Sequence, residues 1–380
     1  MKFKQLAKIT AVNFMLIGFG VLLFEAGLQV VAFLRPSYSV LFLKPDPDLG
    51  WKMVPNYKWK WSGNHWYANA FSLDVKSNSV GFRGNEIIEQ KPLDTVRIAI
   101  LGDSFVEAIQ VPLEQTSANV TEQIMNNSDL AKKWEVLNFG ISNFGVGQYL
   151  LAWDKYVKKY SPDYVAFIIG DLQMKRTVSA HKAGSFSGTE GELLSIRPIF
   201  FIGENGELAF QPAKDYQRFL MLQDDLIGSY FKGERSKRKN NGLIMPKYLN
   251  AFMMRLNYKL SGKKTRPDFS SSSPSTFKDV REVNYLLIRE LARRVSSSGG
   301  ELIMLDASRH QGDQPSTSDF LRKISSELGI HYLPIYENLL ESDRAGRPTT
   351  FHTDGHYNEL GNKIVAEDIS AKIKEIMLLN

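Results

Sequence analysis

One short stretch, a buried-strand pattern that ends in a glycine and a serine, constrains the fold of this chain most. Residues 96–101 read Val-Arg-Ile-Ala-Ile-Leu, in which five of six residues are apolar and three are β-branched. Such a run is typical of a strand buried on both faces of a parallel sheet. Gly102-Asp103-Ser104 follows it, so the turn would place Ser104 at the carboxyl edge, where open α/β sheets bind ligands. Taken alone, Gly-Asp-Ser equally fits an ordinary turn or a helix N-cap.

The rest of the chain repeats this alternation of strands and helices. Further strands are predicted at residues 135–140, 163–169, 301–305 and 331–335, and helices at 116–125, 148–160, 276–295, 316–328 and 359–377. Short turns between such elements predict an α/β fold with a parallel sheet and right-handed crossovers. The alternation breaks at residues 172–274, which we interpret as an insertion after the third strand, with a hairpin around residues 203–206.

A second polar motif lies near the end of the chain. Residues 352–358 read His-Thr-Asp-Gly-His-Tyr-Asn and precede the last predicted helix. A serine nucleophile needs a base, and the base needs an orienting carboxylate. We therefore predict His356 as the base and Asp354 as its orienting carboxylate, while His352 is a weaker candidate for the base. Asp103 is expected to hold the turn at the strand end, and the alternative for His356 and Asp354 is an ordinary loop hydrogen bond.

Taken in order, these motifs resemble those of the SGNH/GDSL hydrolase superfamily. The resemblance runs from about Asp46 to the end and is closest to bacterial members with an N-terminal membrane anchor. Those members have a similar Asn-Ser-x-Gly-Phe-Arg segment, here residues 78–83, and similar residues after the serine, here residues 105–108. The resemblance implies a three-layer, flavodoxin-like parallel sheet. It also implies a catalytic triad of Ser104, Asp354 and His356.

The chain departs from this family pattern at two positions of the oxyanion hole. The second family block supplies a glycine whose backbone N–H binds the oxyanion, and Asn143 occupies that position here. The third block normally contributes an asparagine side chain, but the corresponding residues are Ile169-Gly170-Asp171. The resemblance therefore implies that the backbone N–H groups of Ser104 and Asn143 form the oxyanion hole, without the usual asparagine.

The N-terminal segment has the pattern of a membrane anchor. Residues 9–34 contain no Lys or Arg, and Lys2, Lys4 and Lys8 precede them. A span needs about 20 largely apolar residues, and basic residues before it favour a cytoplasmic N-terminus. We predict a cytoplasmic tail at 1–8, a transmembrane helix at 9–34, a membrane-proximal preface at 35–94 and the hydrolase-type domain at 95–380, on the extracytoplasmic side. The alternative is a cleaved signal peptide.

The preface is rich in aromatic residues. Tyr57-Lys58-Trp59-Lys60-Trp61 alternates, which predicts a strand. Such a strand either packs half-buried on the domain or contacts sugars or lipid headgroups. A basic run at residues 232–241 is most simply a solvated loop and alternatively faces an anionic glycan or phospholipid.

Composition narrows the class of function. The 380-residue chain contains no cysteine, which excludes disulfides, thiolate metal sites and a cysteine nucleophile. Its net charge of +6 is dispersed, and no nucleic-acid motif accompanies it. The remaining histidines, His65, His181, His310 and His331, have no metal-ligand spacing, so we predict no metal and no cofactor.

These observations lead to one expected function and one alternative. We expect an extracytoplasmic, membrane-anchored serine esterase or O-acyltransferase that acts on acyl esters of a cell-surface or exported glycan. The substrate class follows from the predicted location and the family resemblance. The alternative, suggested by the missing third-block asparagine, is a non-catalytic glycan-binding or assembly protein on the same fold.

Overall fold

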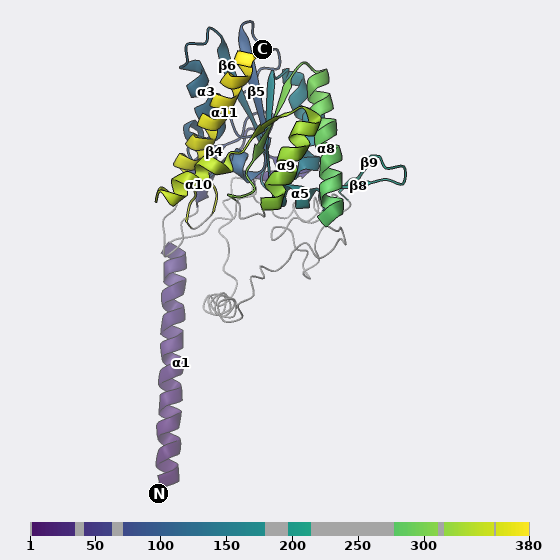
Figure 1. The fold of residues 1–380 in the computed structure, drawn as a ribbon. Coiled ribbons are helices and arrows are strands. Elements are labelled where there is room, and N and C mark those ends of the chain that lie inside the picture. The colour runs from purple at the N-terminus through teal and green to yellow at the C-terminus, as the bar shows by residue number, and fades with distance from the viewer. Residues whose placement is uncertain are drawn as a thin grey trace. The chain divides into compact units, whose positions relative to one another are not determined.

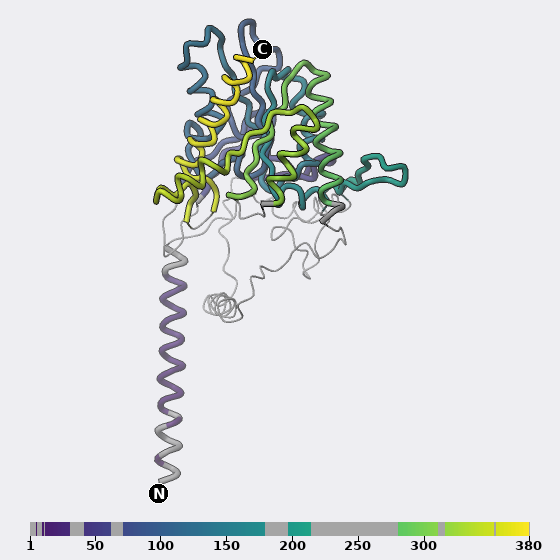
Figure 2. The backbone as a smooth tube through the Cα atoms, in the orientation of Figure 1, coloured from purple at the N-terminus to yellow at the C-terminus, as the bar shows by residue number. Residues whose placement is uncertain are grey.

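The computed structural model describes residues 2–34, 42–62, 71–178, 197–213, 277–310, 315–352 and 355–379. They belong to two compact units, one containing the N-terminal helix and the other containing the α/β domain. Figure 2 follows the described backbone from the purple N-terminal helix to the yellow C-terminal helix. The predicted basic run at 232–241 lies outside the described residues, as does Asp354.

The N-terminal unit contributes one described element, helix α1 (Lys2–Leu34). Its segment Val12–Val30 is long and apolar enough to cross a membrane, a criterion that a cleaved signal sequence also meets. Glu25 is the acidic residue within this apolar segment, and Gln29 one turn later donates a hydrogen bond to it at 2.6 Å. The carboxyl of Glu25 is therefore bonded within its own helix.

The α/β domain is built on a five-stranded parallel sheet with the order β11-β10-β7-β5-β6. The strands are β5 (Thr95–Gly102), β6 (Lys133–Gly140), β7 (Tyr164–Ile169), β10 (Glu301–Asp306) and β11 (His331–Leu333). Numbered along the chain, the spatial order is 2-1-3-4-5, which is the flavodoxin-like arrangement. The predicted parallel α/β fold is confirmed.

Helices cover both faces of this sheet (Figure 1). On one face, α3 (Ser117–Asn126) packs against α11 (Glu359–Leu379). On the other face lie α4 (Val146–Ala152), α8 (Phe277–Ser297) and α9 (Pro315–Leu328). The domain therefore has three layers, as predicted. A sheet that is covered on both faces explains why all eight residues of β5 are buried.

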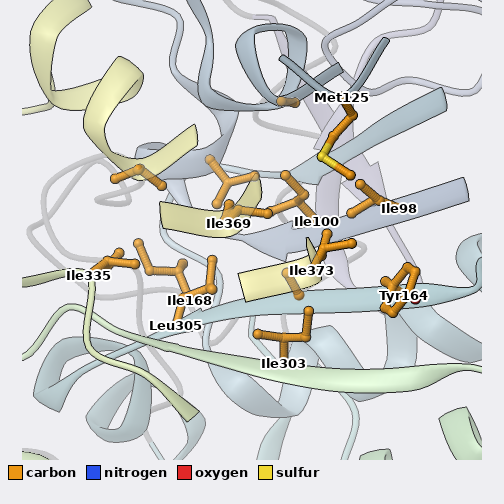
Figure 3. Close-up of a cluster of buried hydrophobic side chains, with 14 of the residues drawn as sticks. Ile98, Ile100, Met125, Tyr164, Ile168, Ile303, Leu305, Ile335, Ile369 and Ile373 are labelled. Atoms are coloured by element: carbon orange, nitrogen blue, oxygen red, sulfur yellow. The ribbon is translucent and has the colours of Figure 1, made fainter. Parts of the chain in front are cut away.

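The main core cluster lies between the sheet and helix α11 (Figure 3). Ile98 and Ile100 of β5 share this face because they are two residues apart on the strand. Ile369 and Ile373 of α11 share a helix face because they are four residues apart, and all four side chains are fully buried. This packing fixes the end of β5, and with it the position of Ser104.

The remaining elements of the α/β domain are short. They are β1 (Leu43–Asp46), β2 (Gly50–Met53), β3 (Lys58–Ser62), β4 (Ser72–Lys76), α2 (Ser104–Glu107), η1 (Leu113–Gln115), η2 (Trp153–Val157), η3 (Lys158–Tyr160), α5 (Asp171–Thr177), β8 (Ile199–Ile202), β9 (Leu208–Gln211) and α10 (Tyr336–Arg344). The pairs β1–β2, β3–β4 and β8–β9 are antiparallel hairpins. The predicted strand at 57–61 and the predicted hairpin around 203–206 are both present as β3 and β8–β9.

Two element predictions were wrong in detail. The helix predicted at 148–160 is α-helical only to Ala152, then π-helical and 3₁₀-helical. The last strand ends at Leu333, because Pro334 follows it, and the unpredicted helix α10 comes next. The segment that we interpret as an insertion, residues 172–274, starts within helix α5.

Candidate active site

Ser104 lies where the sequence predicts, at the turn after β5 on the carboxyl edge of the sheet. It is the first residue of α2 and is partly exposed. Asp103 is the N-cap of this helix and accepts the Phe105 backbone N–H at 3.1 Å. A Cβ on Gly102 would lie 2.2 Å from the Val106 side chain, so only glycine permits α2 to fold back this closely.

Asp103 is fully buried beneath the serine and has two side-chain partners. Its Oδ2 accepts hydrogen bonds from Gln173 Nε2 at 2.9 Å and from Arg176 Nη1 at 2.5 Å. The Arg176 guanidinium compensates the buried negative charge. Through these contacts and the N-cap, Asp103 stabilises the turn at the end of β5, as the sequence predicts.

His356 is far from Ser104 in the sequence but lies close to the same turn. Its imidazole lies against the ring of Phe105, the residue after Ser104, with the ring centroids 5.2 Å apart. The adjacent Tyr357 ring contacts Phe105 as well, with centroids 4.7 Å apart. The hairpin that carries His356 is closed by the Phe351 N–H, which donates to the His356 carbonyl at 2.9 Å. His352, the weaker candidate, is exposed.

The second-block residues form a tight turn beside α2. The Phe144 N–H donates to the Ile141 carbonyl at 3.1 Å, and Asn143 at the third position has φ = +64°. Asparagine tolerates this left-handed conformation better than most residues. Ser142 Oγ donates a hydrogen bond to the buried Glu107 carboxylate, which joins the turn to α2. The structure thus brings Asn143 to the same edge of the sheet as Ser104.

The third-block position carries no asparagine, and its aspartate is engaged elsewhere. Asp171 begins α5 directly after Gly170 and is buried. Its Oδ1 accepts a hydrogen bond from Thr317 Oγ1 at 2.7 Å, and Lys175 lies 3.5 Å from its Oδ2. This carboxylate ties α5 to α9 and cannot replace an amide N–H donor at an oxyanion, because an ionised carboxylate only accepts.

Arg83 of the Asn-Ser-x-Gly-Phe-Arg segment holds the loop after the serine, a contact that the sequence analysis missed. The side chain is 2% exposed, and its guanidinium donates to the backbone carbonyls of Glu107, Ala108 and Val111. Burial lowers the pKa of Arg83 to about 10, which leaves it charged at neutral pH. Arg83 thus satisfies carbonyls that a helix end leaves without partners.

A second missed group anchors the hairpin of His356. His310 Nε2 lies 3.1 Å from Asp343 Oδ2 and 3.0 Å from Thr349 Oγ1. Asp343 Oδ1 also accepts the Thr349 backbone N–H at 2.7 Å, and the Thr349 carbonyl accepts the Asn358 N–H at 3.0 Å. Burial lowers the pKa of His310, while Asp343 opposes this shift. The sequence feature that could have indicated His310 is its position shortly after the end of the predicted strand at 301–305.

Within the described ranges, no group of three or more histidines, cysteines, aspartates or glutamates is arranged to hold a metal ion.

Comparison with known proteins gives structural neighbours only. No protein-family model matches the sequence, and no curated protein matches it. Among solved structures, the chain is similar to an α/β hydrolase enzyme from the metagenome of Lake Arreo, Spain (12% identity, 73% of this chain and 95% of that chain, TM-score 0.40). It is also similar to an acetylxylan esterase from Geobacillus stearothermophilus (12% identity, 73% and 94%, TM-score 0.39). A third is the lipase/acylhydrolase from Enterococcus faecalis (9% identity, 74% and 96%, TM-score 0.39).

Proposed function

We propose that this chain is a serine esterase or O-acyltransferase of the SGNH type. One observation supports it above the others: the His356 ring packs on Phe105, beside a partly exposed Ser104 at the carboxyl edge of a parallel sheet. The serine and the histidine are far apart in the sequence, and the Phe105–His356 contact brings the histidine to the edge where such sheets bind ligands. This is the pairing that nucleophilic acyl transfer requires.

The proposed reaction begins when Ser104 Oγ attacks the carbonyl carbon of an acyl ester and His356 takes its proton. Asp354, from the family resemblance, orients the imidazole. The backbone N–H groups of Ser104 and Asn143 stabilise the oxyanion of the tetrahedral intermediate. Collapse of this intermediate releases the alcohol, which receives the proton from His356, and leaves an acyl-enzyme. Water then completes hydrolysis, or an acceptor hydroxyl completes transfer.

We further propose that the substrate is an acylated cell-surface or exported glycan and that α1 anchors the domain on the extracytoplasmic side of a membrane. The apolar helix and the lysines before it support the location. The substrate class rests on this location and on the resemblance to anchored SGNH proteins, which is an argument by analogy.

Hydrolysis of p-nitrophenyl acetate by the full-length protein in detergent tests the proposed activity. Wild type is expected to release p-nitrophenol, whereas Ser104→Ala loses the activity. Ser326→Ala, at an exposed position of α9, is the matched control and keeps it. Oligosaccharides that can accept an acetyl group are then added to the reaction. An acetylated oligosaccharide product indicates transfer, and free acetate alone indicates hydrolysis. Equal rates for wild type and Ser104→Ala would contradict the proposal.

A second candidate is a non-catalytic glycan-binding or assembly protein on the same fold. The third block favours it, because the residues there are Ile169-Gly170-Asp171 with no asparagine, and the Asp171 carboxylate is bonded to Thr317. Binding of acetylated oligosaccharides by wild type and by Ser104→Ala alike, with no turnover in either, would favour this candidate.

A further inference from the structure

The backbone carbonyls of the turn that carries Asn143 accept hydrogen bonds from side chains of other segments of the chain. Trp51 Nε1 donates to the Ser142 carbonyl at 3.1 Å. Arg197 Nη2 donates to the Asn143 carbonyl at 2.8 Å, and Arg176 Nη1 donates to the Phe144 carbonyl at 3.3 Å. Three consecutive peptide groups of this turn therefore have their carbonyl directions set by residues that are distant in the sequence.

The contact from Trp51 acts on the peptide group that matters for the proposed oxyanion hole. Ser142 C=O and Asn143 N–H belong to one trans peptide, so they point in opposite directions. A donor that holds the Ser142 carbonyl therefore aims the Asn143 N–H away from Trp51. The positive φ of Asn143, with Ser142 at negative φ, is the signature of a type II turn, whose central peptide is flipped relative to type I.

Trp51 is itself rigidly placed. It lies in β2 with no exposed surface, and its ring contacts Phe144 edge-on, with centroids 5.8 Å apart. The Arg197 guanidinium lies 5.3 Å from the centre of the indole ring, within range of a cation–π contact. Gln148 Nε2 donates to the Leu49 carbonyl at 2.6 Å, which fastens the β1–β2 hairpin to α4. The indole N–H is thus a fixed donor.

The turn also abuts the nucleophile helix. A Cβ on Gly140 would lie 2.3 Å from the Glu107 backbone nitrogen, and Ser142 Oγ donates to the Glu107 side chain. The Asn143 N–H therefore leaves a turn that is packed against α2, the helix that begins with Ser104. Its direction relative to Ser104 depends on which way the Ser142–Asn143 peptide faces.

We infer that Trp51 is a positioning residue for the proposed reaction: its indole N–H selects the peptide orientation in which the Asn143 N–H serves the oxyanion hole. This inference rests on the proposed function. It makes the preface hairpin β1–β2 part of the catalytic apparatus, although Trp51 does not touch the substrate. It also explains how an asparagine can stand at a glycine position, because side-chain donors stabilise the flipped turn.

Trp51→Phe in the full-length protein tests the inference, since phenylalanine keeps an aromatic ring and removes the N–H. We expect kcat to fall at least roughly tenfold with KM nearly unchanged, because the oxyanion exists only in the transition state. Affinity for a trifluoromethyl ketone, which forms a tetrahedral adduct with a serine, is expected to fall by the same factor as kcat/KM.

Trp134→Phe is the matched control. Trp134 in β6 is equally buried, and its Nε1 has no hydrogen-bond partner among the described residues, so the same substitution removes no such contact. We expect its kcat to stay at the wild-type value even if melting temperature falls in both variants. Equal kcat losses in the two variants, or a wild-type kcat in Trp51→Phe, would overturn the inference.

If Trp51→Phe does not fold, an isosteric replacement of Trp51 provides a second test. Incorporation of 3-benzothienylalanine at position 51 keeps the bicyclic shape and replaces N–H by sulfur. The inference expects the same selective loss of kcat, and full activity would overturn it. Absence of any Ser104-dependent turnover in wild type would instead overturn the proposed function, and the inference with it.

Discussion

The rings of Phe105 and His356 lie with their centroids 5.2 Å apart, although the two residues are far apart in the sequence. Phe105 follows Ser104 directly, so this contact brings a histidine next to the proposed nucleophile. The sheet supplies the first partner, and the hairpin after α10 supplies the second.

Arg83 is expected to stabilise the loop after the nucleophile. Arg83→Met leaves three backbone carbonyls, those of Glu107, Ala108 and Val111, without their donor. The free energy of unfolding is expected to fall by at least about 2 kcal/mol, since a buried acceptor without a partner costs about 1–3 kcal/mol. Urea unfolding measures this change. Arg344→Met, at an exposed end of α10, is the control. An equal loss of stability in both variants would contradict the stabilising role of the Arg83 hydrogen bonds.

Stability is expected to fall below about pH 6.5 because of His310. Burial lowers its pKa in the folded state from the ordinary value of 6.5. The unfolded chain therefore binds a proton at a higher pH than the native protein does. Stability is lost as the pH falls from the pKa of His310 in the unfolded chain to its lower pKa in the folded protein. The slope is at most about 1.4 kcal/mol per pH unit for one proton.

Urea unfolding between pH 7.5 and 5 measures this dependence. The pKa of Asp343 is lowered from 3.8, so its contribution is lost only at more acidic pH and does not overlap this range. His310→Gln is expected to flatten the profile. A wild-type slope that persists in this variant would assign the effect to another group.

The fold was predictable because its signals are local. The six residues before Gly102 include five apolar ones, which predicted a fully buried strand, and β5 has eight buried residues. The amphipathic pattern of residues 359–377 predicted the last helix, and Gly102 predicted the turn that carries Ser104. Helix α10 was not predicted, because its nine residues begin two positions after Pro334, and proline is typical of turns and loops.

The supports of the site were not predictable from the sequence. Trp51 and Arg83 each act through a hydrogen bond to the backbone of a segment far along the chain. Such contacts depend on how the hairpins pack on the sheet, which no local periodicity encodes. The left-handed conformation of Asn143 was foreseeable as a possibility of its residue type, but the donors that select it were not.

The side chain of Asn143 is expected to contribute to the proposed oxyanion hole in addition to its backbone N–H. Asn143→Gly keeps the backbone donor and tolerates φ = +64°, so it removes only the carboxamide. We expect kcat to fall at least roughly tenfold if the carboxamide acts in the transition state. Asn143→Asp, which places a negative charge there, is expected to be slower still. Unchanged or higher kcat in the glycine variant would limit the role of Asn143 to its backbone.

The proposed topology places the α/β domain outside the cytoplasm. A reporter that is active only outside the cytoplasm, fused after Asn380, is expected to be active, because the lysines before the apolar segment retain the N-terminus inside. A reporter that requires the cytoplasm serves as the control and should be inactive. The reverse pattern would contradict the topology, and a soluble form that lacks residues 1–34 would indicate a cleaved signal.

Labelling with a fluorophosphonate, followed by mapping of the modified residue by mass spectrometry, tests the central claim most directly. This reagent phosphonylates a serine only when the hydroxyl is activated as a nucleophile. We predict an adduct on Ser104 in wild type and none at this position in Ser104→Ala. In His356→Ala the labelling rate should fall at least roughly 100-fold, the lower range for loss of a general base. An adduct on a different serine, or labelling of Ser104 that is unaffected by His356→Ala, would contradict the account.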